Sequence, residues 1–442
     1  MARRKDWPVE EAVVKDLMID GRGVADTEGK TVFIDGALTG ERVRFQRRRK
    51  RKSFDEASLI EVLQASPQRV EPNCESFGIC GGCALQHLNA EAQLDLKQKV
   101  LVDAFQRIGN VMPEEQLPPL AGRTYGYRRR ARLGARLVEK KGRVLVGFRE
   151  KHKPYIADMG HCETLVEPLA KLIAPLSELI QGLDICRELP QIELSYGDNF
   201  SSLVFRVLAA PSAQDILKFE AFAVKFNAQI WLQTGGPQTL RLLNGAAEGP
   251  PLVYRLPEFD LSLEFGPLDF VQVNQDMNRL MLTQTMELLK PLPGEHILDL
   301  FCGIGNFTLP IARSGAAVTG VELDSHMVEK GRANARLNGI ENAEFHIADL
   351  SAPETEQAWW HHDYSAVLLD PPRAGALEVL PMVVRTGARR ILYVSCHPGS
   401  LARDAGVLVK EHGYRLVSAG AMDMFPQTGH VEAMALFVKD AA

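Results

Sequence analysis

The chain has 442 residues and a formal net charge of −5, and 45% of its residues are hydrophobic. This length suggests roughly three domains, and the apolar content excludes an intrinsically disordered chain. The charge is uneven, because residues 1–160 hold 30 Lys and Arg against 22 Asp and Glu, a sum of +8, which leaves −13 for residues 161–442. A basic first part and an acidic second part indicate a region that binds a polyanion, joined to a region with another task.

The N-terminal segment is charged and has no apolar stretch behind it, so we expect no signal peptide. No apolar run is long enough to cross a bilayer, so we expect a cytoplasmic protein without membrane association. Thiols stay reduced in that compartment. The seven cysteines therefore need an explanation other than disulfides.

Residues 10–66 predict a small β-barrel domain, in which turn glycines separate strand-like runs such as 32–34 and 42–45. Residues 42–52 contain eight basic side chains and no acid. Such a run repels itself unless it meets an anion, although it could also be a merely solvated loop. We expect RNA phosphates to contact Arg47, Arg48, Arg49 and Lys50. Neutralising these four residues should then weaken the salt dependence of RNA binding.

Residues 67–265 form the predicted central α+β domain, which contains an amphipathic helix at about 90–108. Its segment 123–132 mixes arginines with two tyrosines. Arginine binds phosphate and tyrosine stacks on unpaired bases, so this segment indicates an RNA surface. A basic strand without ligand is the alternative. Residues 200–258 show no motif.

From residue 266 to the C-terminus, buried strand-like runs alternate with helical stretches. This alternation predicts an α/β domain of the Rossmann-like, doubly wound kind with a mostly parallel sheet. Ligands of such domains bind beyond the carboxyl ends of the strands.

The pair Gly303 and Gly305 follows one of these strands, and Glu322 ends the next. Glycines let the backbone approach a ligand closely, and a carboxylate can accept ribose hydroxyls. The third glycine of a dinucleotide fingerprint is absent, which favours a smaller nucleoside, although a turn without ligand is also possible. Residues 299–306, DLFCGIGN, resemble the first motif of S-adenosylmethionine (SAM) methyltransferases. That resemblance implies a cofactor pocket lined by Asp299, Phe301 and Asn306, with Glu322 at the ribose and Asp349 near the adenine.

Cys396 ends another strand and precedes a helix expected at about 399–411. A helix N-terminus lowers the pKa of a thiol and makes it nucleophilic, which predicts a reactive Cys396. The alternative interpretation is that Cys396 is a buried structural cysteine. Asp370 ends the preceding strand and should open onto the same crevice. Glu432 enters the last strand, where it could also be an exposed strand-end acid.

A methyl donor, a thiolate and a carboxylate suit methylation at C5 of uracil. C5 is weakly nucleophilic until a thiolate adds to C6, and a base must afterwards remove the C5 proton. Cys396 and Glu432 fit these two roles.

Five segments occur in order in the C-terminal half, namely FVQVN (270–274), DLFCGIGNF, DPPRAG, YVSCHP and MFPQTGHVE. Together they resemble the RNA uracil-C5 methyltransferase family. The resemblance implies Cys396 as nucleophile, Glu432 as base, and Gln272 and Asp370 in the SAM site. It also implies that Phe270 and Arg132 contact the target base after it leaves its stack.

Three cysteines, Cys74, Cys80 and Cys83, are closely spaced, and a more distant fourth could complete a ligand set. Spacing alone does not separate a four-cysteine zinc site from an iron–sulfur cluster. The family resemblance implies a [4Fe–4S] cluster with Cys162 as the fourth ligand.

The cysteine set together with an N-terminal domain that resembles TRAM, an RNA-binding β-barrel, matches one branch of the family. This resemblance implies that the chain methylates uridine 1939 of 23S rRNA, and we expect its partner to be that RNA, free or in a partly assembled large subunit. The alternatives are the same chemistry on another rRNA or tRNA uridine, and an RNA-binding iron–sulfur sensor without catalysis. The sequence shows no unpaired hydrophobic stripe that would indicate a subunit interface, so we expect a monomer.

Overall fold

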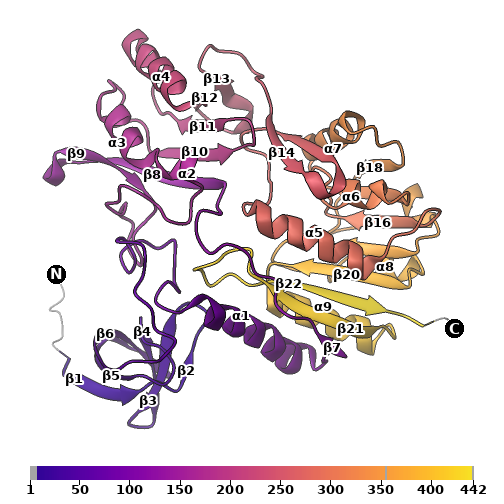
Figure 1. The fold of residues 1–442 in the computed structure, drawn as a ribbon, viewed down its shortest axis with the longest axis horizontal. Coiled ribbons are helices and arrows are strands. Elements are labelled where there is room, and N and C mark those ends of the chain that lie inside the picture. The colour runs from indigo at the N-terminus through magenta and orange to yellow at the C-terminus, as the bar shows by residue number, and fades with distance from the viewer. Residues whose placement is uncertain (1–6, 354–355, 441–442) are drawn as a thin grey trace.

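The computed structural model describes residues 7–353 and 356–440, and it places a six-stranded N-terminal sheet apart from a second six-stranded sheet and an eight-stranded sheet (Figure 1). The N-terminal sheet is curled and has the strand order β1-β5-β6-β4-β3-β2. Its strands are β1 (Val9–Val13), β2 (Asp16–Leu17), β3 (Arg22–Thr27), β4 (Lys30–Asp35), β5 (Arg42–Lys50) and β6 (Phe54–Gln64). Val32, Ile34, Val43 and Phe45 alternate toward its inside and are fully buried. This sheet agrees with the β fold expected for residues 10–66.

The segment 65–89 carries the three closely spaced cysteines and contains neither helix nor strand. Helix α1 (Ala90–Ala104) follows, and its N-terminus is capped because the Asn89 side chain accepts a hydrogen bond from the Ala92 N–H. A π-helical turn (Phe105–Gly109) extends it. The helix predicted at 90–108 is thereby confirmed.

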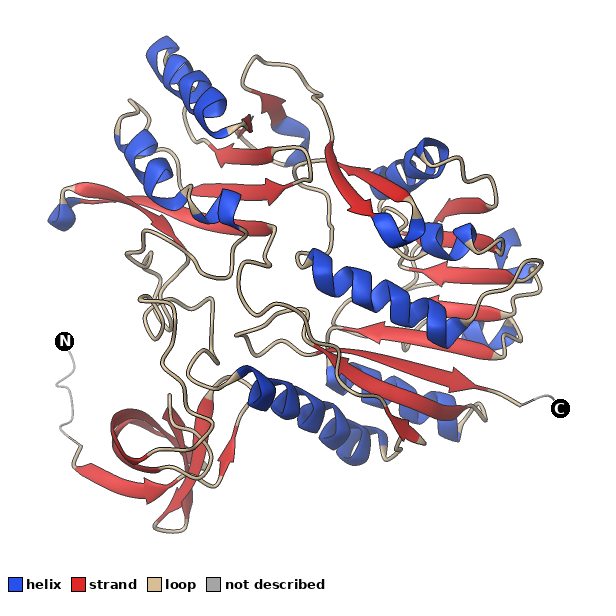
Figure 2. Ribbon diagram, viewed as in Figure 1, coloured by secondary structure: helices blue, strands red, loops and turns tan. Residues whose placement is uncertain are grey.

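A central six-stranded mixed sheet has the order β13-β12-β11-β10-β8-β9, and helices α3 and α4 pack on it (Figure 2). The elements are β8 (Arg130–Val138), β9 (Arg143–Gly147), α2 (Glu167–Ala170), α3 (Ile173–Gln181), β10 (Gln191–Tyr196), β11 (Ser201–Arg206), α4 (Ala213–Phe226), β12 (Ala228–Gln233) and β13 (Leu240–Leu242). A hairpin of β14 (Leu252–Leu256) and β15 (Leu261–Phe265) links this sheet to the last part of the chain.

The C-terminal sheet has the order β18-β17-β16-β19-β20-β22-β21-β7. Strands β16 to β20 pair in parallel, whereas β22 is antiparallel to both neighbours, which confirms a doubly wound, mostly parallel fold. Its elements are α5 (Gln275–Leu289), β16 (His296–Leu300), α6 (Thr308–Arg313), β17 (Ala317–Glu322), α7 (Ser325–Leu337), β18 (Ala343–Ile347), β19 (Ala366–Leu369), α8 (Leu380–Arg385), β20 (Arg390–Ser395), α9 (Pro398–Lys410), β21 (Arg415–Met422) and β22 (Glu432–Val438).

Segments from before residue 266 also take part in this C-terminal unit. Strand β7 (Glu115–Gln116) pairs with the edge strand β21, and α1 packs beside α9 and β21 (Figure 1). Leu101 and Phe105 join the hydrophobic core on that face of the sheet, and the β14–β15 hairpin joins the core on the other face. Among the described residues, no helix combines the length and hydropathy that crossing a bilayer requires.

Candidate active site

A cavity of about 1560 Å³ opens at the carboxyl ends of the parallel strands. Its walls include eight residues that the sequence singled out, which are Phe270, Gln272, Phe301, Glu322, Asp349, Asp370, Cys396 and Glu432. Asn306 lines a smaller pocket that shares Gln272, Phe301 and Asp370 with the cavity. The fold therefore brings together groups from five separate strand ends, as parallel α/β topology requires.

The turn after β16 is shaped by its backbone conformation. Phe301, Gly303 and Gly305 have φ values of 67°, 55° and 93°, and such a conformation strains a residue with a Cβ. The N–H groups of Phe301 and Cys302 both donate to the Val321 carbonyl, at 2.9 and 3.1 Å, which holds the strained turn against β17. The phenyl ring of Phe301 is thus presented to the cavity.

Glu322 is fixed in orientation at the end of β17. Its Oε2 accepts a hydrogen bond from the Gly303 N–H at 3.2 Å, and its Oε1 accepts one from the Leu323 N–H at 2.7 Å. Asp349 is exposed, and its carboxylate caps the turn at Ser351. Asn306 forms a reciprocal side-chain pair with Asn278, at 2.8 and 3.0 Å. Carboxylates held in this way can accept hydrogen bonds from a nucleoside.

The position expected for Asp299 in the pocket wall is wrong. Asp299 is fully buried under the turn, where its Oδ2 accepts a hydrogen bond from the Thr308 hydroxyl at 2.5 Å. It lines no part of the cavity, and burial raises its pKa to about 7. Because Asp299 lies in the core, it supports the turn after β16 through its hydrogen bond with Thr308 and does not touch a ligand.

Cys396, Asp370 and Glu432 line the same cavity and are close enough to influence one another electrostatically. Removal from water raises the pKa of Glu432 to about 8, and the neighbouring Asp370 adds to this increase. Burial likewise raises the pKa of Asp370 to about 7. A carboxylate with a pKa in this range can gain or lose a proton near neutral pH, which suits a general base.

The lowered thiol pKa expected for Cys396 is contradicted. Burial raises its pKa to about 11, and the negative charges of Glu432 and Asp370 add to this effect. Only Arg373 and the backbone oppose them. The expected helix is present as α9, but its influence is outweighed by loss of hydration and by two nearby acids.

Phe270 lines the cavity, whereas Arg132 is not among its lining residues. Phe270 is 64% exposed although it lines the cavity, so its ring is free to contact a ligand. Arg132 lies outside that lining and pairs with Glu193 at 2.9 Å, with 68% of its side chain exposed. Arg130, also on β8, donates a hydrogen bond to the Leu268 carbonyl at 2.8 Å. This bond connects the central sheet to the loop that contains Phe270.

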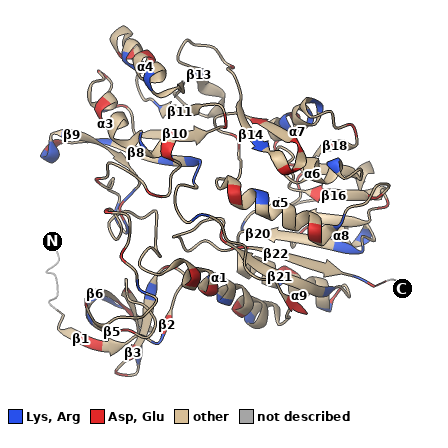
Figure 3. Cartoon of the chain, in the orientation of Figure 1, with Lys and Arg blue, Asp and Glu red and all other residues tan. Residues whose placement is uncertain are grey.

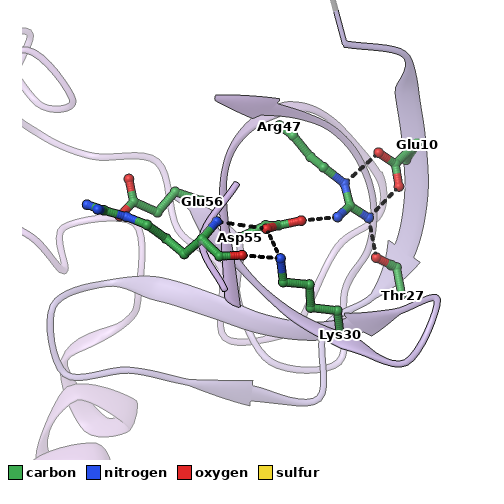
Figure 4. Close-up of polar contacts among 7 residues, drawn as sticks. Glu10, Thr27, Lys30, Arg47, Asp55 and Glu56 are labelled. Atoms are coloured by element: carbon green, nitrogen blue, oxygen red, sulfur yellow. Dashed lines mark hydrogen bonds and ion pairs between the residues drawn. The ribbon is translucent and has the colours of Figure 1, made fainter. Parts of the chain in front are cut away.

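The N-terminal basic run is partly neutralised by acids from neighbouring strands. Arg47 donates two hydrogen bonds of 2.8 Å to Glu10 and one to Asp55, and only 4% of its side chain is exposed (Figure 4). The expectation that Arg47 contacts RNA is therefore corrected, because its guanidinium is buried and already paired. The remaining members, Arg48, Arg49 and Lys50, are exposed, and Arg48 pairs with Asp35 at 2.6 Å.

The four cysteines expected to bind iron influence one another electrostatically. Burial raises the pKa of Cys80 to about 11 and that of Cys83 to about 12, and negative charge on Cys162 and Cys74 contributes. The Cys80 sulfur accepts a hydrogen bond from the Gly82 N–H at 3.4 Å. In the residues that the structure describes, no three His, Cys, Asp or Glu side chains are arranged to hold a metal ion.

Sequence reasoning missed Arg373, Phe425 and His430, which also line the cavity. All three belong to the strand-end segments DPPRAG and MFPQTGHVE. Their position at strand ends was the available signal, because side chains there converge whatever their type.

The expected methyltransferase fold is also supported by comparison with known proteins. The family model for tRNA (Uracil-5-)-methyltransferase matches residues 261–440. A solved structure, the tRNA (uracil-54, C5)-methyltransferase of Pyrococcus abyssi in complex with S-adenosyl-L-homocysteine, is 26% identical. It superimposes with a TM-score of 0.75 over 97% of this chain and 99% of its own.

Two curated proteins are much closer in sequence, and both are named 23S rRNA (uracil(1939)-C(5))-methyltransferase RlmD. The protein from Alkalilimnicola ehrlichii is 47% identical over 441 residues, which cover 99% of each chain. The protein from Methylococcus capsulatus is 48% identical over 437 residues, 98% of each chain. With such similarity along nearly its whole length, the chain belongs to the RlmD family of 23S rRNA (uracil(1939)-C(5))-methyltransferases.

Proposed function

We propose that this chain transfers a methyl group from SAM to C5 of a uridine in 23S rRNA, at the position numbered 1939 in the names of its relatives. The observation that carries the proposal is the meeting of Cys396, Asp370 and Glu432 in one cavity with the fixed carboxylate of Glu322. An RNA-binding sensor without catalysis would not require this convergence.

In the proposed reaction, the Cys396 thiolate forms a bond to C6 of uracil, and the electron pair of the C5=C6 bond moves to C5. The electron pair at C5 then forms a bond to the methyl group of SAM, the S–CH3 bond breaks, and S-adenosylhomocysteine leaves with that bonding pair on its sulfur. The carboxylate of Glu432 then takes the C5 proton, and the released pair restores C5=C6 and expels the thiolate. The positive charge of Arg373 favours the thiolate that this step needs.

We assign the SAM site to Gln272, Phe301, Asn306, Glu322, Asp349 and Asp370. Phe301 offers a ring for packing, and Glu322 offers a carboxylate to ribose hydroxyls. The target base would be contacted by the exposed ring of Phe270 and by Arg132, whose side chain is 68% exposed. A base must leave its stack to reach a site recessed in this way.

The test is incubation with labelled SAM and 23S rRNA that lacks the modification. Label is expected on uracil C5, and Cys396→Ala should abolish its incorporation because the C6 adduct cannot form. Full activity in that variant would contradict the nucleophile assignment. A tRNA transcript serves as the second substrate, because the Pyrococcus abyssi enzyme of similar fold acts on tRNA; preferential labelling of that tRNA would instead favour this alternative.

We also propose that Cys74, Cys80, Cys83 and Cys162 would hold a [4Fe–4S] cluster when it is bound, although their side chains are not arranged as a metal-binding group among the described residues. Their mutual repulsion as thiolates fits a site that a cationic cluster would neutralise, and the Gly82 N–H offers the type of hydrogen bond that sulfur ligands accept. Purified protein should be brown, and Cys80→Ser should bleach it. A colourless protein that contains zinc would overturn the cluster.

We also propose the domain boundaries, the RNA-binding surface, the cellular location and the oligomeric state of the chain. Residues 10–66 would be a TRAM domain, 67–265 the cluster-bearing central domain and 266–442 the methyltransferase domain. Lys and Arg residues occur along the N-terminal sheet and on β8 (Figure 3), and Arg48, Arg49 and Lys50 of β5 are exposed and available to RNA. An enzyme that acts on ribosomal RNA, free or in a partly assembled subunit, would work in the cytoplasm, and we propose that it does so as a monomer.

A further inference from the structure

The loop between β21 and β22, residues 423–431, is held mainly by parts of the chain outside the methyltransferase fold. We call it the base loop because Glu432 follows it directly. Phe425 and His430 of this loop line the cavity. Its conformation therefore determines where the carboxylate of Glu432 lies relative to a bound uracil.

Four consecutive carbonyls of the base loop each accept a hydrogen bond from elsewhere. The donors are the Asn274 side chain to Met424 O (3.2 Å), the Lys97 ammonium to Phe425 O (3.0 Å), the Tyr127 hydroxyl to Pro426 O (2.9 Å), and the Ala84 and Leu85 N–H groups to Gln427 O (2.8 and 3.0 Å). All except Asn274 precede residue 266. Gln427 has φ of 69°, a strained conformation that persists only when its surroundings hold it.

Lys97 is unusual among these donors because it is a charged group in the core. Its side chain is 1% exposed on the inner face of α1, and its Nζ lies 2.5 Å from Oδ1 of Asp423, itself 5% exposed. A buried ammonium costs several kcal/mol in desolvation, and an apolar residue of the same length would pack this helix face at least as well. Packing therefore gives no reason for a lysine here.

We propose that Lys97 is a positioning residue for the base: its ammonium clamps the base loop through Asp423 and Phe425, and its charge favours the ionised carboxylate of Glu432. This inference rests on the proposed function of Glu432. It assigns to α1 a role in the reaction as well as in the fold.

The charges around Glu432 determine the sign of the expected effect. Asp370 beyond β19 raises its pKa, whereas Lys97 on α1 and Arg373 lower it. Cys396 beyond β20 and His430 of the base loop line the same cavity as Glu432, and Asp423 is the ion-pair partner of Lys97. Without Lys97 the pKa of Glu432 rises further, so more of the base is protonated at neutral pH and the rising limb of the rate moves to higher pH.

The test is Lys97→Met in the full-length protein, with Lys99→Met as the matched control. Lys99 lies on the same helix, but it is 51% exposed and pairs with exposed Asp16. With SAM and unmodified 23S rRNA, Lys97→Met should lower the turnover rate at pH 7 by about tenfold or more. The covalent RNA–protein adduct should accumulate, the rate should rise only at higher pH, and the KM for SAM should be unchanged. Lys99→Met should match the unaltered protein.

A rate and pH profile of Lys97→Met equal to those of Lys99→Met would overturn the proposal. If Lys97→Met does not fold, Asp423→Asn loosens the same clamp while keeping the lysine, and adduct accumulation is again expected; its absence would overturn the clamp. The variant Glu432→Gln, measured in parallel, distinguishes failure of the base assignment from failure of the positioning role of Lys97. If that variant turns over normally, the base assignment itself fails, whereas a stalled Glu432→Gln beside a normal Lys97→Met removes only the role of Lys97.

Discussion

The N-terminal sheet and the catalytic cavity both withdraw carboxylates from water, with opposite results. Burial alone would raise the pKa of Asp55, but hydrogen bonds from Lys30 and Arg47 lower it (Figure 4). In the part of the chain that the structure describes, neither Asp370 nor Glu432 pairs with a lysine or arginine, and their pKa values rise to about 7 and about 8.

The partners of these carboxylates differ between the two regions. A buried carboxylate with two cationic donors stays ionised and fixes the fold, and these donors hold its pKa too low for proton transfer near neutral pH. A carboxylate withdrawn from water and facing another acid keeps its proton until about neutral pH, which makes it available for proton transfer. The same residue types thus serve structure in one region and a reaction in the other.

The largest expected effect comes from removing the unpaired acid. Glu432→Gln keeps the shape but cannot take the C5 proton, so turnover should fall by about 10²–10⁴-fold and the methylated adduct should persist as a shifted band on a denaturing gel. The barrel carboxylate Glu10, changed to Gln, is the control and should leave turnover unchanged. Normal turnover of Glu432→Gln without a shifted band would show that the base is another group.

The second effect comes from breaking the paired acid. Arg47→Met leaves Asp55 with less compensation in the core of the N-terminal sheet, so the free energy of unfolding of this region should fall by about 3–5 kcal/mol. Urea unfolding measures the loss. Arg48→Met is the control, because the Arg48 side chain is 43% exposed and its pair with Asp35 should contribute about 0–1 kcal/mol. Equal losses in both variants would contradict the distinction between buried and exposed pairs.

The smallest effect concerns RNA binding. Arg48→Gln, Arg49→Gln and Lys50→Gln together should reduce the slope of log K against log salt by about one for each phosphate that the variant no longer neutralises. Arg47→Met, compared under conditions where it is folded, should leave that slope unchanged because its guanidinium already binds Glu10 and Asp55. A reduced slope in Arg47→Met would show that this pairing opens when RNA binds.

The sequence was sufficient for features that depend on local patterns. Alternating buried runs predicted the parallel sheet, and residues at the strand ends, such as Asp370 and Cys396, indeed meet in one cavity. It was insufficient where distant segments decide the outcome. The acids that neutralise Arg47 come from β1 and β6, and the carboxylates that raise the pKa of the Cys396 thiol come from other strands. The lysine that holds the base loop is 326 residues away from Asp423 in the chain.

The most direct test of this contrast is an NMR titration of the Glu432 carboxyl group in protein with ¹³C-labelled glutamate, assigned by the resonance missing from Glu432→Gln. A midpoint near pH 8 is expected, coupled to a second titration near pH 7 from Asp370. Because this folded-state pKa exceeds the unfolded one, the stability contributed by the protonated acid is present at low pH and is lost as the pH rises through 8. A midpoint near 4.5, the ordinary value for glutamate, would contradict the account.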